Sequence, residues 1–413
     1  MMQGDQERMS LAPLIPLGLA AFAGFLNLFG MNPFFVDIAD DIGATVSMVG
    51  YTSTVALLTT AAAGLIVGPI SERVGIRRIL VIGLVLAAGG AIATALAINF
   101  GSLVLARILA GVGGSITGGV TISAAALLYS GRQRQQALAI ITAAAAMAVV
   151  IGIFVMTMLA EPYGWRGAYV ILGAALLLIG LLNRLMLDRA GRSADATGLG
   201  IRALIAPYRP ILGEPSLRRL FVGATLHPAT LNGTTAYLGA FLISQHDTST
   251  QMVGLVFSLV GATYFVGNLL AGNLGQLPQH VIVGTGILLM GGFWAAGYLL
   301  PVPTLVVTGS FGLATFAAGI AWVTLLNMIA NRSPSNVGTA MVLSSSLLSL
   351  GGAIGIGLSA VLLDITGYAG LAIGMGLLAV FGAAASWVGP PVQANEPSSR
   401  AAAHQKAAEQ SQG

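Results

Sequence analysis

Long apolar runs with few interruptions constrain this chain of 413 residues more than any other feature. A helix needs about 20 apolar residues to cross the hydrocarbon core of a bilayer. Only helices and closed barrels can cross, because every backbone polar group must be satisfied within the membrane. The runs are continuous rather than alternating, which favours helices over barrel strands. Since 56% of the residues are hydrophobic and 8% are charged, the sequence predicts an all-α membrane protein.

Twelve runs are long enough to cross. We predict membrane helices over residues 11–36, 46–69, 77–98, 101–130, 136–160, 166–187, 218–245, 250–276, 279–300, 303–330, 337–363 and 366–388. The first ten residues are polar and lack a signal-peptide cleavage pattern, so we expect the first run to remain as a helix. The predicted domains are an N-terminal six-helix half (1–187), a cytoplasmic linker (188–217), a C-terminal six-helix half (218–388) and a disordered tail (389–413).

Landmarks repeat between the two halves at a nearly constant distance, which indicates an internal duplication. Gly152 matches Gly355 at an offset of 203, and the same offset relates Gly164-Trp165 to Gly367-Tyr368. At an offset of 204, Gly64, Gly68 and Glu72 match Asn268, Gly272 and Gln276. The repeat supports a division into six helices and six helices.

The distribution of basic residues predicts the orientation, because Lys and Arg accumulate on the cytoplasmic side of membrane spans. With an even number of spans and a cytoplasmic start, all of the eighteen Lys and Arg residues except Arg107 and Arg166 lie inside. We therefore expect both termini in the cytoplasm and the protein in a bacterial inner membrane.

The stretch GLIVGPISERVGIRRIL, residues 64–80, breaks at Gly68-Pro69 into what we predict to be a tight basic turn between two membrane helices. Its glycines allow the reversal, and Glu72 can pair with the flanking arginines or cap the next helix. The pattern G-x-x-x-[DE]-R-x-G-x-[RK] resembles the loop between helices 2 and 3 of the major facilitator superfamily of secondary transporters. The residues that carry this cytoplasmic gate motif are Gly68, Glu72, Arg73, Gly75 and Arg77. The alternative, a plain basic loop, would need neither the glycines nor the acid.

The resemblance covers about residues 11–388 and extends to LVLARILAGVGGSITGG, in the helix predicted over 101–130. Leu103, Arg107, Gly111 and Gly113 match the superfamily's pattern there, whereas Ala110 stands where Gln is usual. The resemblance implies two pseudo-symmetric six-helix bundles with the substrate held between them. A guanidinium inside a span is costly unless it finds partners. Arg107 is therefore a candidate for proton coupling or substrate contact, and the alternative is a structural clamp onto backbone carbonyls.

The helix predicted over 218–245 carries the clearest polar stripe. Its residues follow one another at spacings of three and four and so share one face: His227, Thr230, Thr234, Tyr237 and Phe241. His227 lies near the middle of its span, where an ionisable group is a functional candidate. The alternative is a neutral imidazole bonded to a nearby hydroxyl or carbonyl.

The resemblance also implies which helices line the central cavity, namely the first, fourth, seventh and tenth. The substrate-cavity candidates are Asn27, Met31, Arg107, His227, Thr230, Thr234, Tyr237 and Trp322, and the proton-coupling candidates are His227, Arg107 and Asp37. Phe34 and the row Ser345, Ser349 and Gly352 are further candidates, for which lipid contact or helix packing is the alternative.

Several classes of function are disfavoured. The chain has no cysteine, which removes thiol chemistry and cysteine-ligated metals. It lacks a Walker lysine motif, HExxH and GxSxG, and the basic residues behind its pI of about 9.6 lie in loops between spans, not in a nucleic-acid site. The helix 5 signature of the superfamily's drug/proton antiporters is not intact, since the matching region, residues 143–165, has Gly152 but no proline before Pro162.

The sequence therefore predicts a monomeric secondary transporter, not an enzyme, with no cofactor or metal. We expect it to export a small organic solute by alternating access, driven by protons, because the cavity candidates are mostly apolar, aromatic and neutral. Two alternatives stay open. One is an uptake permease for a small organic anion held by Arg107 and His227, and the other is a membrane sensor that keeps the fold without transport.

Overall fold

The computed structural model describes residues 12–129, 131–187, 208–274, 277–333 and 337–389, and within these ranges the regular structure is helical throughout. The first half comprises α1 (Leu14–Phe29), η1 (Asn32–Phe34), α2 (Phe35–Ile42), α3 (Val46–Val74), α4 (Ile76–Ala95), α5 (Phe100–Leu128), α6 (Gly131–Met147), η2 (Ala148–Gly152) and α7 (Ile153–Met186). The second comprises α9 (Arg209–Gly213), α10 (Pro215–Ala236), α11 (Leu238–His246), α12 (Thr250–Leu270), η4 (Ala271–Leu274), α13 (Gln279–Leu299), α14 (Thr304–Arg332) and α15 (Val337–Ser386).

Nine helical stretches among the described residues are long and apolar enough to cross a membrane. Two of them, Gln136–Met186 and Thr339–Ser386, have 51 and 48 residues, and each contains a glycine with positive φ. Gly164 (φ 68°, ψ 169°) and Gly367 (φ 67°, ψ −163°) adopt backbone angles that only glycine adopts readily, so each stretch bends into two crossings. The twelfth crossing is α10 with α11, which is less apolar because it carries the polar stripe. The predicted twelve-helix all-α membrane fold is confirmed.

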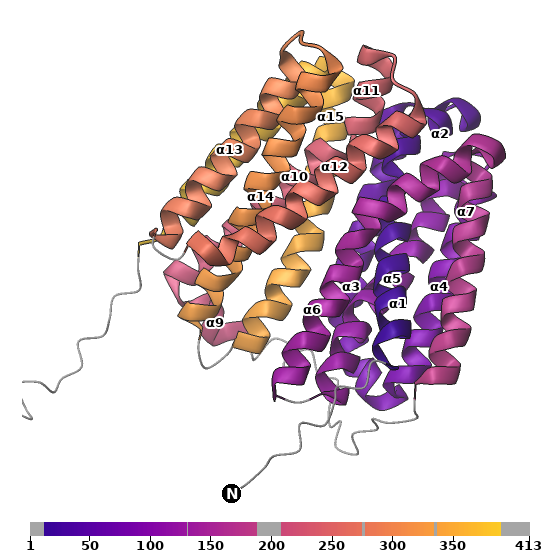
Figure 1. Ribbon diagram of the computed structural model, residues 1–413, viewed down its shortest axis with the longest axis vertical. Helices are drawn as coiled ribbons and strands as arrows, with labels where there is room; N and C mark the ends of the chain where they lie inside the picture. The colour runs from indigo at the N-terminus through magenta and orange to yellow at the C-terminus, as the bar shows by residue number, and fades with distance from the viewer. Residues whose placement is uncertain (1–11, 130, 188–207, 275–276, 334–336, 390–413) are drawn as a thin grey trace, which may run out of the picture.

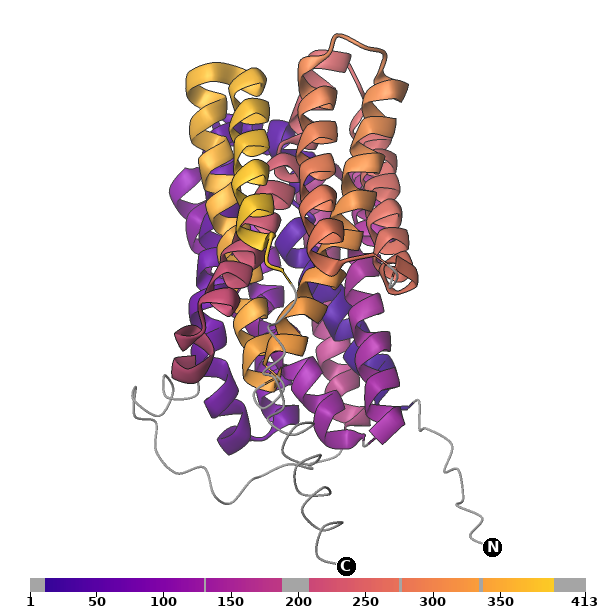
Figure 2. The ribbon, with the colours of Figure 1, turned by 90° about the vertical axis from the view of Figure 1, so that its left-hand side faces the viewer.

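The helices form two bundles. In the first, α4 packs on α5 and α7, while α1 packs on α5 and α6; in the second, α10 and α13 pack on α15, and α12 packs on α14. Figure 1 shows the indigo and magenta first bundle beside the orange and yellow second one, and Figure 2 shows the same helices after a quarter turn. Gly164 and Gly367, which the repeat relates, both interrupt a long helical stretch with a positive φ.

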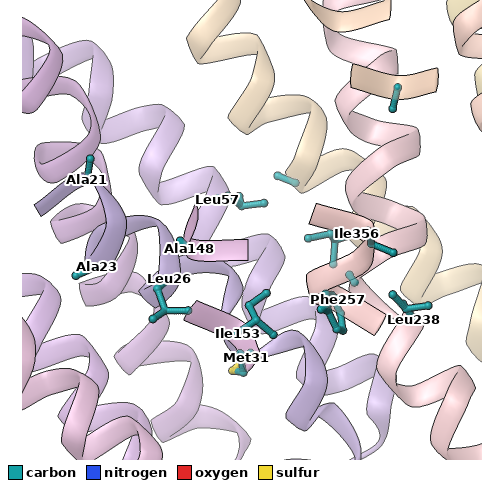
Figure 3. Packing of buried hydrophobic residues seen from close by; sticks show 14 of the residues in the cluster. Ala21, Ala23, Leu26, Met31, Leu57, Ala148, Ile153, Leu238, Phe257 and Ile356 are labelled. Carbon is teal, nitrogen blue, oxygen red and sulfur yellow. The ribbon is translucent and has the colours of Figure 1, made fainter. Parts of the chain in front are cut away.

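The two ends of the molecule differ. At one end, α2 lies against α11 (top of Figure 1); we call this the α2 end and the opposite end the α9 end. Contacts between the halves include those of α11 with η1 and α2, of α3 with α15, and of α12 with α7 and η2. A single core of buried apolar residues runs through both halves. Figure 3 shows part of it, with Met31 and Ile153 on one side and Phe257 and Leu238 on the other.

The predicted turn at Gly68-Pro69 is wrong in its position and length. Helix α3 continues to Val74 and α4 begins at Ile76, so the reversal falls on the single residue Gly75, with φ 91°. Arginine and glutamate favour helices, so the helix continues past the end of the apolar run. Glu72 and Arg73 therefore belong to the last turn of α3, not to a loop.

Two further predicted helices are interrupted. In the first crossing, α1 ends at Phe29, and the chain passes through the short turn η1 and continues as α2 to Ile42. Gly43, with φ 65°, ends α2. Pro33 lacks the backbone N–H that an unbroken helix would use, which accounts for the interruption. The helix predicted over 218–245 is likewise divided at Tyr237 into α10 and α11. Most of the predicted linker, the predicted tail and Gln276 lie outside the described residues.

Candidate functional site

Arg107 of α5 is completely buried, and its guanidinium binds backbone carbonyls of the first crossing. One terminal guanidinium nitrogen donates to the carbonyl oxygen of Asn27, and the other donates to that of Leu28, both over 2.8 Å. The Asn27 amide in turn donates to the carbonyl of Ala87 over 3.1 Å. The carbonyls of Asn27 and Leu28 lie in the last turn of α1, and carbonyls in the last turn of a helix have no partner within the helix. The arrangement has the geometry of a clamp, the structural alternative that the sequence left open.

His227 is also buried, and it bridges two helices of the second half. Its Nε2 lies 3.0 Å from the carbonyl oxygen of Ala318 in α14, and since a carbonyl can only accept, Nε2 carries the hydrogen. Its Nδ1 has no hydrogen-bond partner. The ring of Trp322 stacks on the imidazole, with ring centroids 5.4 Å apart. Two of the predicted cavity residues therefore lie in contact, and Trp322 remains partly exposed.

The rest of the polar stripe is buried and largely satisfied within its own half. The hydroxyl of Thr230 donates to the carbonyl of Leu226, and that of Thr234 donates to the carbonyl of Thr230. Further along, Phe241 packs among the rings of Tyr298, Phe311, Tyr368 and His246. These contacts make the stripe part of the packed interior of the second bundle.

Tyr237 and Met31 lie where the two halves meet. The Tyr237 ring packs edge-on against Phe35 of α2, with centroids 5.6 Å apart, and its hydroxyl lies 3.4 Å from the carbonyl oxygen of Ile356. Met31 is fully buried just before η1. The candidates thus form three groups: Arg107 with Asn27, His227 with Trp322, and Tyr237 at the contact between the halves.

The gate motif is described only in part. The side chains of Glu72 and Arg73 and those of residues 68–71 lie outside the described set, although their backbone belongs to α3. Gly75 makes the reversal. Arg77 donates to the carbonyl of Leu187 over 3.3 Å, which joins the start of α4 to the end of α7.

Asp37 lies at the α2 end, half-buried, and the side chain of Thr250, at the start of α12 in the other half, approaches it. Beside it is a hollow of about 470 Å³, which opens at the surface and is lined by Asp37, Thr157, Ala160, Glu161, Gly164, Trp165, Ser249, Thr250 and Gln251.

A cluster of polar contacts at the α2 end was not predicted from the sequence. The Asp41 carboxylate accepts from the Arg166 guanidinium over 2.8 Å and from the Trp165 indole over 3.1 Å. Arg166 also donates to the carbonyl of Ala95, which ties the start of the sixth crossing to the end of the third. The sequence did offer a signal for this cluster, because Arg166 is the basic residue predicted to lie at the outer end of the molecule. Within the described part of the chain, no three His, Asp or Glu side chains gather as a metal site would require.

Comparisons with known proteins agree with this architecture. A family model described as Major Facilitator Superfamily matches residues 17–274 and 220–411. A chloramphenicol resistance protein of Streptomyces lividans is 28% identical over 354 residues, covering 83% of this chain and 87% of that protein. The uncharacterised MFS-type transporter YceJ of Bacillus subtilis (strain 168) is 23% identical over 337 residues, covering 81% of this chain and 84% of that protein.

Among solved structures, a bacterial homologue of the human lysosomal transporter Spinster, in an inward-facing and unoccupied conformation, has the same fold. It superposes with a TM-score of 0.74 at 18% identity and covers 93% of this chain and 97% of its own. Two bundles of membrane helices, the matched family model and these relatives lead to one assignment: the chain belongs to the major facilitator superfamily of membrane transporters.

Proposed function

We propose that this protein exports a small organic solute across the bacterial inner membrane, driven by the proton gradient. The observation that carries the direction is its similarity, over 83% of its length, to a protein named for chloramphenicol resistance. Resistance to a drug that acts inside the cell is what export would produce. The neutral and aromatic character of the cavity candidates suits an uncharged or weakly polar solute.

The described geometry weighs against the main alternative, uptake of an organic anion. Such a permease would present Arg107 and His227 to a carboxylate. Both are buried here; the terminal guanidinium nitrogens donate to backbone carbonyls, and His227 uses its ring hydrogen on Ala318. Trp322, in contrast, is partly exposed over His227 and offers an aromatic face to a ligand.

Transport would follow from movement of the two bundles about the solute, so that the cavity opens to one side at a time. With both termini in the cytoplasm, the α2 end of the molecule faces the outside of the cell in this proposal. The coupling proton would bind at His227 or at Asp37, which are the candidates for a group whose protonation changes between the two states. We propose that one chain is the working unit.

The test is a flux measurement with everted membrane vesicles. In these vesicles the cytoplasmic side of the protein faces the external medium. The lumen is acidified, and a panel of radiolabelled solutes that includes chloramphenicol is offered outside. We expect at least one solute to accumulate, and nigericin to abolish that accumulation by collapsing the pH gradient. Vesicles without the protein are the control. Accumulation only in right-side-out vesicles would establish uptake instead, and no movement in either orientation would favour a sensor.

A further inference from the structure

The hollow at the α2 end is bounded by both halves of the molecule. Its first-half wall consists of Asp37 of α2 and of α7 residues between positions 157 and 165, and its second-half wall is the start of α12, residues 249–251. Its volume of about 470 Å³ falls within the range of sites that hold small organic molecules. Because the hollow opens at the surface, a ligand can enter it from outside the bundles.

Two carboxylates, those of Asp37 and Glu161, line this hollow. In the described part of the chain, Arg166 forms its salt bridge with Asp41, and neither Asp37 nor Glu161 forms one. Asp40 is close enough to Asp37 to interact with it electrostatically, which adds to the negative field. A concave site lined by charges of one sign concentrates ions of the opposite sign, so the hollow favours cations.

The aromatic wall of the hollow is Trp165, which two contacts hold in place. Its indole N–H donates to the Asp41 carboxylate over 3.1 Å, and the central carbon of the Arg166 guanidinium lies 4.5 Å from the ring centroid. The charge of Arg166 is balanced by Asp41, so it does not cancel the carboxylates of the hollow. An aromatic ring attracts cations through its electron-rich face and packs against other flat rings. The small residues Ala160 and Gly164 line the same wall.

These features fit an organic cation better than an inorganic ion. Calcium and magnesium ions take about six or more oxygen ligands. Within the described ranges, however, no three His, Asp or Glu side chains gather. A hollow of about 470 Å³ is also far larger than a metal ion, and an anion would meet two carboxylates. A ligand with a cationic group and a flat apolar body would use the carboxylates, the indole and the volume together.

We propose that this hollow is a second ligand site, which binds a small aromatic amidinium or guanidinium compound. The planar N–H groups of such a cation match the two oxygens of a carboxylate through paired hydrogen bonds. The cationic group lies between Asp37 and Glu161, and the ring packs beside Trp165. Because α7 and α12 both contribute walls, a bound ligand contacts both halves. The site includes neither Arg107 nor His227, and the inference holds whichever solute is transported and in whichever direction.

Radiolabelled benzamidine, a flat aromatic amidinium, is the probe for this site. Its binding is measured by scintillation proximity with purified protein in lipid nanodiscs, where both faces are accessible and no transport is needed. We expect saturable binding at a single site. Unlabelled phenylguanidine should compete with the probe, whereas neutral benzamide and anionic benzoate, which have the same flat shape, should not.

Three variants test the walls. Glu161→Gln changes an exposed side chain by its charge alone and should weaken benzamidine binding about fivefold or more. The double variant Asp37→Asn with Glu161→Gln should abolish binding. Ala160→Trp, which fills the hollow without changing any charge, should abolish it too. The matched control is Asp364→Asn, which removes an exposed carboxylate that does not line the hollow and should leave binding unchanged.

Equal weakening by Asp364→Asn would overturn the site, because overall negative charge would then attract the probe. Binding that Trp322→Ala removes and Glu161→Gln leaves intact would overturn it as well, since benzamidine would then occupy the predicted transport cavity. Displacement of the probe by micromolar Ca²⁺ would assign the hollow to a metal ion instead. Absence of saturable binding would overturn this site alone, and because the assay needs no flux, a failure of the proposed export leaves the test intact.

Discussion

At the scale of single residues, Arg107 shows how a charge can be kept inside a membrane protein. Its two terminal nitrogens satisfy carbonyls of Asn27 and Leu28 at the end of α1, and its burial excludes water. A charged donor that is hydrogen-bonded to two backbone acceptors avoids much of the cost of an unpaired charge.

Removing this clamp should destabilise the first half. Arg107→Ala leaves two buried carbonyls without their donors, and we expect a loss of about 3 kcal/mol or more in the free energy of unfolding. The measurement is the thermal unfolding midpoint in detergent, with Arg134→Ala, an exposed arginine, as the control. If Arg107→Ala melts like the unchanged protein but transports nothing, the guanidinium serves the transport cycle and not the fold.

The proton-coupling candidates differ in a way that permits a second test at this scale. His227→Gln keeps a side-chain donor for the Ala318 carbonyl but removes the titratable ring. We predict that it abolishes accumulation driven by a pH gradient and retains downhill exchange, whereas Asp37→Asn leaves accumulation largely intact. Both are measured as solute flux with and without the gradient. Uncoupling by Asp37→Asn alone would place the proton site at the α2 end and leave His227 as part of the cavity wall.

At the scale of helices and turns, glycines decide where the chain reverses. Gly75 alone separates α3 from α4, and Gly164 and Gly367 bend α7 and α15 at equivalent places. Apart from the adjoining backbone, no heavy atom lies within 4 Å of a Cβ added at Gly164 or Gly367, so each glycine is needed for its backbone angles and not for space.

Gly164→Ala and Gly367→Ala should each lower the free energy of unfolding by about 1–3 kcal/mol, because alanine is strained at those backbone angles. Gly292→Ala, in the helical interior of α13 with equally open space, should be neutral or slightly stabilising. Chemical denaturation in detergent, followed by tryptophan fluorescence, compares the three. Equal effects of all three would show that backbone strain at the two corners is not the determining factor.

The basic turn offers another prediction at this scale. Arg77 joins α4 to the end of α7 through the Leu187 carbonyl, whereas Arg78 is exposed. If the motif holds the first-half helices together in the outward-open state, Arg77→Ala and Glu72→Ala should reduce the transport rate several-fold without loss of membrane insertion. Arg78→Ala is the matched control for charge. An equal loss on changing Gln276, the repeat-related residue, would argue against an asymmetric gate.

At the scale of the whole molecule, the balance of basic residues predicts one orientation in the membrane. All of the eighteen Lys and Arg residues except Arg107 and Arg166 fall on one side when the chain starts in the cytoplasm. The structure accounts for both exceptions: one is clamped inside the first bundle, and the other is paired with Asp41 at the α2 end.

Reporter fusions test this orientation directly. Alkaline phosphatase fused after Val388 should be inactive, and green fluorescent protein at the same place should fluoresce, because both report a cytoplasmic position. A fusion within the exposed turn at Asp247 is the complementary control and should give active phosphatase. The reverse pattern at both sites would invert the topology and place the α2 end inside.

Features that depend on local chemistry can be predicted from the amino-acid sequence alone. Apolar length set the number of crossings, and the constant offset of Gly164 and Gly367 indicated the duplication. Periodicity placed the polar stripe of the helix predicted over 218–245 on one face, but it could not tell whether that face lines a cavity or packs in the interior. The break of the apolar run at Gly68-Pro69 misplaced one turn, because helix α3 continues past that run to Val74.

Which residues contact each other across the molecule follows only from the packing of the helices. Nothing local to Gly50 indicates that Tyr237, 187 positions later, takes the place of its missing side chain, nor that Asp41 pairs with Arg166. Hydrophobic length is a property of each segment and can be read one helix at a time. Contact across the two halves depends on how all twelve helices pack together, and that is fixed only when the bundles are folded and set against each other.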